Sequence, residues 1–80
     1  MKRRTLKDLA PGQRAKIVKI NGSGAIRRRL VEMGVTPGSE VEMERYAPLG
    51  DPVEIKLKGT HLSLRKSEAE IVDIDPEGTK

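Results

Sequence analysis

Apolar residues alternate with polar or charged ones over residues 53–57 and again over residues 60–64. This period of two is typical of strands that bury one face. Lys58 and Gly59 separate the two runs, and glycine accepts the positive φ that a two-residue hairpin turn requires. The pattern therefore predicts a β-hairpin over residues 53–64.

Three further strands are expected over residues 13–20, 40–47 and 71–74. Apolar side chains occupy both phases of the first segment, so we expect this strand to bend, to bulge or to pass between two packed faces. Gly12 and Gly38 each follow a proline just before a strand, and Pro-Gly is typical of the central positions of a type II turn. Both glycines are therefore interpreted as structural turn residues.

One helix is predicted over residues 25–33. Its buried face is expected to carry Ile26, Leu30 and Met33, which recur at helical spacing. Gly34 follows directly, and glycine readily adopts the left-handed conformation that ends many helices. This is the longest helix that the sequence predicts.

Two single helical turns are expected over residues 5–9 and 67–70. Each begins with Thr or Ser and carries an acid three residues later, which is the pattern of a capping box. The whole chain, residues 1–80, is expected to form one domain with an ordered core over about residues 5–75. Residues 75–80 are expected to form a loose polar tail.

Five short strands and one inserted helix, in a chain too short for two packed sheets, favour a small, partly closed barrel. The predicted fold class is mainly β with one inserted α-helix, as an SH3-like barrel. An OB-fold remains the structural alternative, because it also places five strands and one helix around a small core. Neither fold decides function.

Composition restricts the function further. The 80 residues include no Cys, Trp or Phe, and the single aromatic residue is Tyr46. Aliphatic packing must therefore stabilise the core, and the chain has little with which to stack a base or a sugar. No apolar stretch approaches the length of a membrane span, and the basic start is not followed by an apolar signal region. We expect a cytoplasmic protein without direct membrane insertion.

Charge is distributed unevenly along the sequence. Up to Leu30 there are ten Lys or Arg residues and one acid, Asp8, whereas from Val31 onward there are six basic residues and eleven acids. A basic surface could face an acidic protein or a phosphate backbone. A compact fold could equally interleave the two parts and cancel the field, and both interpretations stay open at this point.

The usual signs of catalysis and metal binding are missing. His61 is the single histidine and has no Cys or Ser in a nucleophile arrangement. The acids at positions 40, 42 and 44 fit the solvated face of a strand better than a metal site. Gly22 and Gly24 precede the helix but lack the further residues of a nucleotide-binding loop. The sequence thus predicts no enzyme activity, no cofactor and no metal site.

Three consecutive arginines, residues 27–29, give the helix its most distinctive feature. They are expected to fan around its exposed side, with Arg28 able to pair with Glu32. They could form a docking surface for an acidic partner or for phosphates, or simply a solvated face. Val31 favours docking, because an apolar residue among arginines is typical of interface centres.

Several motifs together resemble the FeoA family of small accessory proteins in bacterial ferrous iron uptake. They are Gly34, the Pro-Gly pair at residues 37–38, Ala-Pro-Leu-Gly-Asp-Pro at residues 47–52 and Leu-Ser-Leu-Arg at residues 62–65. The resemblance extends from about Leu6 to Ile74. It implies an SH3-like barrel without enzymatic activity that helps the ferrous iron permease FeoB by contacting its cytoplasmic GTPase-bearing region. The barrel also resembles the C-terminal domain of iron-dependent repressors.

The leading hypothesis is therefore a protein–protein adaptor that its partner could recruit to the inner face of the membrane. Its contact face is expected to combine the helix of residues 25–33 with the proline-containing loop of residues 48–52. The candidate contact residues are Arg27, Arg28, Leu30, Val31, Pro48, Leu49, Gly50, Asp51 and Pro52, and the structural turn residues are Gly12, Gly34, Gly38 and Gly59. Leu30 also suits the core.

Three alternatives stay open. The chain could be a small basic nucleic-acid-binding barrel, an interaction domain of a metal-dependent regulator or a carrier of ferrous iron. The missing stacking aromatics make nucleic acid the less favoured partner. A homo-oligomer is possible.

Overall fold

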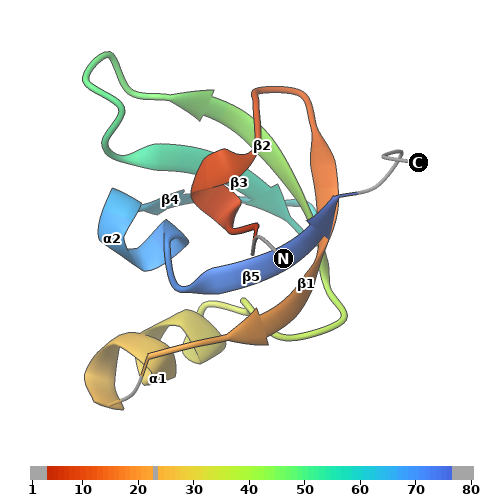
Figure 1. Cartoon of the computed structure of the whole chain (residues 1–80), viewed down its shortest axis with the longest axis vertical. Helices are drawn as coiled ribbons and strands as arrows, with labels where there is room; N and C mark the ends of the chain where they lie inside the picture. Colours follow the sequence, from red (N-terminus) through yellow and green to blue (C-terminus); the bar gives the residue numbers. More distant parts are fainter. Residues whose placement is uncertain (1–3, 23, 77–80) are drawn as a thin grey trace.

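The computed structural model describes residues 4–22 and 24–76. In chain order the elements are the 3₁₀ turn η1 (Leu6–Asp8), β1 (Arg14–Ile20), α1 (Gly24–Glu32), β2 (Glu40–Tyr46), β3 (Val53–Leu57), β4 (Thr60–Leu64), α2 (Lys66–Ala69) and β5 (Val72–Pro76). The five strands form one antiparallel sheet in the order β4-β3-β2-β1-β5. The sheet curls, and α2 and η1 lie across the opening between its two edge strands (Figure 1).

A single aliphatic core fills the curled sheet. Its largest fully buried side chains come from all five strands, from η1 and α1, and from the short segments that follow these two helical elements. They are Leu6, Leu9, Ile17, Leu30, Val35, Val41, Met43, Val53, Ile55, Leu57, Leu64 and Val72. The predicted five strands, inserted helix and aliphatic interior are therefore confirmed.

The expected irregularity of the first strand is a bulge. The register of β1 with β5 shifts between Ile17 and Lys19, which leaves Val18 55% exposed while Ile17 and Ile20 are buried. A bulge adds one residue to one strand and sharpens its bend. A second register shift, between Met43 and Arg45 of β2, had no sequence signal.

The glycine turns follow the sequence closely. Gly12 and Gly38 both have φ of 91°, and each turn closes with a backbone hydrogen bond between the residues that flank it. Lys58 and Gly59 have φ of 53° and 79°, which is the positive-φ pair of a type I′ hairpin turn. These three predicted turns are confirmed.

The end of α1 is a Schellman motif. Gly34 has φ of 98°, its N–H donates to the carbonyl of Val31 at 3.0 Å, and the N–H of Val35 donates to the carbonyl of Leu30 at 2.9 Å. The predicted glycine cap is thus confirmed. The predicted buried face is wrong in one respect, since Ile26 is 48% exposed while Leu30 is buried and Met33 is half-buried.

Two boundaries near the C-terminus also differ from the prediction. α2 begins at Lys66, and the acid that accepts a hydrogen bond at its start is Glu68, from the backbone N–H of Arg65, rather than Glu70 in a box with Ser67. β5 continues to Pro76, because its last two residues pair with β1, so the polar tail does not begin at residue 75. Residues 77–80 lie outside the described part of the chain.

Strand pairing interleaves the two differently charged parts of the sequence. The basic outward residues of β1 lie opposite acids of β2 and β5 in the pairing register. These register partners are Arg14 with Glu42, Lys16 with Glu40 and Asp75, and Lys19 with Asp73. Opposite charges on neighbouring strands largely cancel their field at a distance. The sheet is therefore not a basic surface, which weakens the case for a nucleic-acid-binding barrel.

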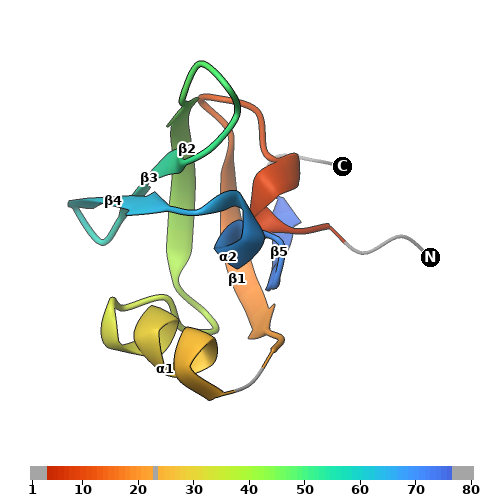
Figure 2. The same cartoon turned by 90° about the vertical axis from the view of Figure 1, so that its left-hand side faces the viewer.

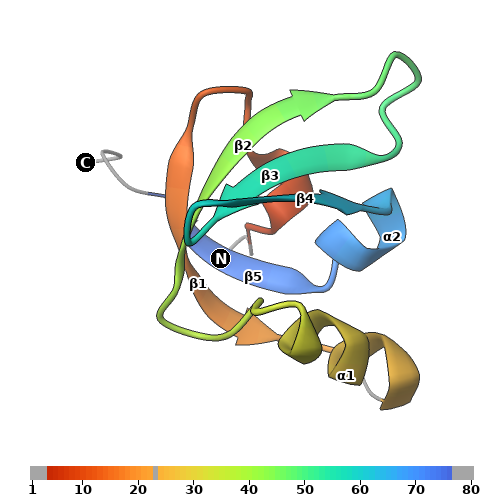
Figure 3. The ribbon, with the colours of Figure 1, turned by 180° about the vertical axis from the view of Figure 1, so that it is seen from behind.

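The two edges of the sheet differ. The N-terminal segment covers the outer side of β5, where Ile74 N–H donates to the carbonyl of Arg4 at 2.9 Å and Thr5 forms a bridge with Asp73. At the other border, β4 pairs with β3 alone among the described elements. The sheet thus keeps one strand edge without a neighbouring strand (Figure 3).

Candidate functional site

The candidate contact residues lie in two places on one side of the molecule. α1 occupies one end of this side and the loop of residues 47–52 occupies the other, with α2 between them (Figure 2). The expected single face of helix and loop is therefore not formed by direct contact between the two. We call the surface made by α1, α2 and the loop the docking side.

The loop of residues 47–52 is a compact, exposed turn. Gly50, with φ of 84°, donates its N–H to the carbonyl of Ala47 at 2.7 Å, and Ala47 donates to the carbonyl of Pro52 at 3.0 Å. Leu49 stands at its tip and is 96% exposed. Because hydrogen bonds and two prolines restrict the backbone, this apolar side chain can be buried by a partner at a low entropic cost.

α2 connects the loop to α1 through its polar groups. Asp51 of the loop accepts a hydrogen bond from the backbone N–H of Lys66 at 2.9 Å. Glu68 is 3% exposed and accepts from the N–H of Arg65 at 2.9 Å. Its other oxygen pairs with Arg29 of α1 at 2.5 Å. The docking side is thereby held by one chain of contacts from the loop to the helix.

The outer side of α1 carries free charge and exposed apolar surface. Arg27, Arg28 and Glu32 form no ion pair in the described part of the chain, so the expected pairing of Arg28 with Glu32 is wrong. These side chains, with Gly24 and Val31, line a shallow hollow of about 340 Å³. Val31 is 40% exposed, as expected. The helix thus offers an apolar spot flanked by cations.

Leu30 does not belong to this surface. Its side chain is fully buried and joins the core, so its expected place among the contact residues is corrected. The reason is geometric, because Leu30 lies on the side of α1 opposite to the hollow. Leu30 anchors the helix, and the residues on the outer side remain available.

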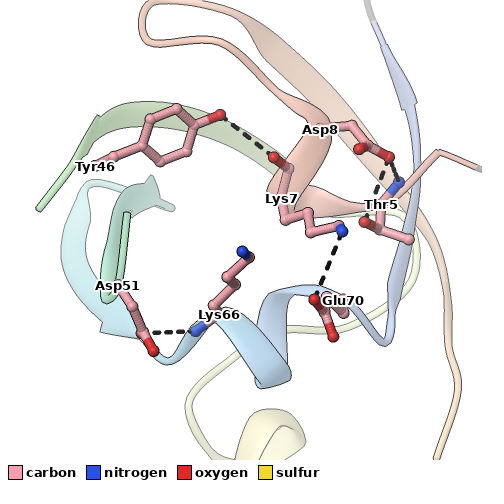
Figure 4. Close-up of polar contacts among 7 residues, drawn as sticks. All are labelled: Thr5, Lys7, Asp8, Tyr46, Asp51, Lys66 and Glu70. Atoms are coloured by element: carbon pink, nitrogen blue, oxygen red, sulfur yellow. Dashed lines mark hydrogen bonds and ion pairs between the residues drawn. The ribbon is translucent and has the colours of Figure 1, made fainter. Parts of the chain in front are cut away.

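Tyr46 holds the end of β2 against η1. Its hydroxyl donates to the carbonyl of Leu9 and lies 3.3 Å from the carbonyl of Lys7, as Figure 4 shows for Lys7. Burial and, to a smaller extent, the charge of Asp8 raise the pKa of the Tyr46 hydroxyl. Lys7 also pairs with Glu70 beyond α2 at 3.5 Å (Figure 4). Sequence reasoning missed this role of the single aromatic residue, since no motif marks it.

Two further ion pairs lie on the surface of the sheet. His61 lies on the exposed face of β4 and its Nδ1 is 2.8 Å from a carboxylate oxygen of Glu44. Arg45 pairs with Glu54 at 2.9 Å, and this contact raises the pKa of the arginine. Within residues 4–22 and 24–76 no three acids, histidines or cysteines gather as a metal site would require. No helix in these ranges is long and apolar enough to cross a bilayer.

Comparison with known proteins identifies the family. Residues 4–76 match the model of the FeoA domain. The chain is 34% identical over 70 residues to an Fe(2+) transport protein A/Fe(2+) transporter FeoB fusion protein of Porphyromonas gingivalis. This match covers 88% of the chain and 8% of the fusion protein, so the chain spans less than a tenth of that relative.

Solved structures agree with this match. Iron(II) transport protein A of Clostridium thermocellum has a TM-score of 0.90 and 39% identity, over 94% of this chain and 46% of that one. FeoA of Stenotrophomonas maltophilia, a prokaryotic SH3 domain protein solved with zinc, has a TM-score of 0.79 and 34% identity, over 90% and 89%. The predicted SH3-like barrel is confirmed and the OB-fold is excluded. The chain belongs to the FeoA family.

Proposed function

We propose that this chain is a non-catalytic accessory protein of ferrous iron transport that works by docking onto the cytoplasmic GTPase-bearing region of a FeoB-type transporter. The observation that carries the proposal is the relative from Porphyromonas gingivalis, in which transport protein A and the transporter FeoB are one fusion protein. Fusion keeps two proteins at a high effective concentration, which favours contact between them.

The geometry of the docking side supports this role. This side carries three exposed apolar side chains, Ile26 and Val31 on α1 and Leu49 on the loop. Charged side chains of α1 line the same hollow as Val31. Arg27 and Arg28 pair with no acid among residues 4–22 and 24–76, so an acidic patch on the partner could pair with them. Apolar anchors with nearby arginines are typical of the centres of protein interfaces.

A titration tests the proposal. The isotopically labelled chain is mixed with the soluble cytoplasmic part of the transporter, once in its GDP state and once with a GTP analogue. We expect saturable amide shifts that map to α1, α2 and the loop of residues 47–52. No saturable shift in either nucleotide state would contradict docking, and shifts confined to the outer face of the sheet would place the contact elsewhere.

Two charge variants distinguish a specific contact through α1 from unspecific electrostatic attraction. R27Q/R28Q removes the two unpaired cations of α1 and should weaken binding about tenfold, mainly through a slower association rate. K56Q/K58Q removes the same charge from the exposed sheet surface and should leave binding within about twofold. An equal loss in both variants would indicate unspecific attraction.

The purified chain also tests the alternative that it binds nucleic acid. On the sheet, basic residues of β1 lie opposite acids in the pairing register, and on α1 Arg27 and Arg28 are the cations without an ion pair among the described residues. We therefore expect no retention of mixed RNA or DNA at moderate salt. Tight binding with a steep salt dependence would revive that alternative.

A further inference from the structure

No backbone group in the described part of the chain forms a hydrogen bond with the outer edge of β4. β5, at the opposite border, is covered by the N-terminal segment through Arg4 and Thr5. Proteins usually protect an open edge with Lys, Pro or a bulge. β4 has the sequence Thr-His-Leu-Ser-Leu, which contains neither residue, and its pairing with β3 is regular throughout.

Two residues of β4 direct their backbone groups outward. The hairpin turns at Lys58 and Gly59, so the flanking residues Leu57 and Thr60 form a hydrogen-bonded pair. Hydrogen-bonded and open pairs alternate along an antiparallel ladder. The N–H and C=O groups of His61 and Ser63 consequently point away from β3, toward the free edge, and no described backbone group bonds to them.

The outward backbone groups of β4 can pair with the same groups of a second copy. In an antiparallel two-fold pairing centred on Leu62, His61 lies opposite Ser63 of a second copy and Ser63 lies opposite its His61. Both residues then exchange both backbone hydrogen bonds, which satisfies all the outward groups. The half-buried Leu62 meets its own copy, and no two like charges face each other.

We propose that β4 is a self-association edge, through which two copies of this chain join their sheets in an antiparallel β4–β4 pairing. The occupant of the edge is a second copy because the register, the polar pairs and the central leucines all match across the two-fold axis. The proposal does not depend on the docking side, since β4 presents a backbone edge and α1 and the loop present side chains.

The contact is small, so the dimer is weak. A pairing of five-residue strands buries far less than the roughly 1,200 Å² at which specific, stable interfaces begin. We expect a dissociation constant on the order of 10⁻⁴ to 10⁻³ M. Such a dimer is populated at high local concentration, for example where several copies gather on an assembled partner.

Solution measurements on the whole chain test the pairing. Amide shifts, amide exchange and translational diffusion are followed from about 0.05 to about 2 mM protein, a range that spans the expected dissociation constant. We expect slower diffusion at high concentration, with shifts and exchange protection centred on His61 and Ser63. No concentration dependence up to about 2 mM overturns the proposal, as does a dependence that maps to α1 or the loop.

A charge exchange tests the register. In H61K/S63K two pairs of lysines would face each other, so self-association should fall at least about tenfold. The two lysines should not destabilise the monomer, because Glu44 lies next to position 61 and Glu54 lies opposite position 63. H61E/S63E should likewise not self-associate, and mixing the two variants should restore a dimer. If the glutamate variant does not fold, the lysine variant alone still decides.

A control and an alternative occupant complete the test. V18K adds a lysine at an exposed residue of the central strand β1 and should leave self-association unchanged. Unchanged self-association in H61K/S63K would refute the β4 pairing. If the transporter fragment shifts the amides of His61 and Ser63 while the chain alone shows no dimer, a partner strand occupies the edge and the second copy is excluded.

Discussion

Replacement of Glu68 by alanine measures how firmly α2 is held and how far it supports α1. The carboxylate is almost fully buried and makes two contacts, one with the N–H of Arg65 at 2.9 Å and one with Arg29 at 2.5 Å. Loss of a capping acceptor costs about 1 kcal/mol. The pair with Arg29 contributes about another 1 kcal/mol, since the arginine side chain is 53% exposed and solvent weakens the attraction.

The free energy of unfolding should therefore fall by about 2 kcal/mol in E68A. For a domain of this size, 1 kcal/mol lowers the melting temperature by roughly 4 to 8 °C, so a decrease of roughly 8 to 16 °C is expected by circular dichroism. E70A is the matched control. Glu70 makes an exposed pair with Lys7 at 3.5 Å, and its loss should cost less than about 1 kcal/mol.

A double-mutant cycle of R29A and E68A isolates the contact between α1 and α2. The coupling energy should be about 1 kcal/mol. The cycle matters because each single variant also changes other groups, the N–H of Arg65 in one case and a buried carboxylate in the other. Coupling close to zero, or equal melting temperatures for E68A and E70A, would refute the argument that Glu68 joins the two helices.

Three further outcomes are expected. L30A should lower the free energy of unfolding by about 3 kcal/mol in urea titrations, because a fully buried leucine leaves a cavity; a loss below about 1 kcal/mol would mean that α1 is not anchored there. G34A should cost about 1 to 2 kcal/mol by the same method, since φ of 98° strains any residue with a Cβ, although the added Cβ would meet only the Leu57 side chain, at an ordinary contact distance of 3.7 Å. In an ultraviolet titration Tyr46 should ionise above its usual pKa of 10.0. The folded chain holds this proton more tightly than the unfolded chain, so the related stability is present below pH 10 and is lost as the pH rises through the higher folded pKa; a midpoint at 10.0 or below would contradict this.

Local patterns predicted the strands and turns well because their causes are local. Alternation over residues 53–57 reports burial directly, and the positive φ at Gly34 and Gly59 is a requirement that few other residues meet. The mixed phases of residues 13–20 likewise announced a bulge. They could not show which residue would face solvent, because the pairing with β5 decides that Val18 is exposed.

Errors arose where distant residues compete with a local motif. Ser67 and Glu70 fit a capping box, yet the helix starts earlier, where Glu68 accepts from the N–H of Arg65 and its carboxylate also meets Arg29 from α1. Ile26 fits the helical stripe, yet it is exposed because α1 is anchored to the core near its C-terminal end. Helical spacing shows which face turns inward but not how much of that face is covered.

The candidate contact residues stay a prediction, and their arrangement in space could not be predicted from the sequence. Nothing in the sequence shows that α2 lies between the loop and α1, since this follows from the curl of the sheet (Figure 2). Long-range pairing likewise decided that the basic and acidic parts of the sequence interleave. Tyr46 was noted for its rarity, whereas its contact with Leu9 depends on where η1 lies.

The backbone bond between Ile74 and Arg4 has a consequence for how this module can be built into larger proteins. A polypeptide that enters the barrel at residue 4 and leaves after β5 does so at one spot on its surface. Another domain could therefore be joined at either end, or the barrel could be inserted into a host loop, without disturbing α1 or the free border of β4. The same barrel can therefore occur as a separate protein or as part of a fusion with little structural change.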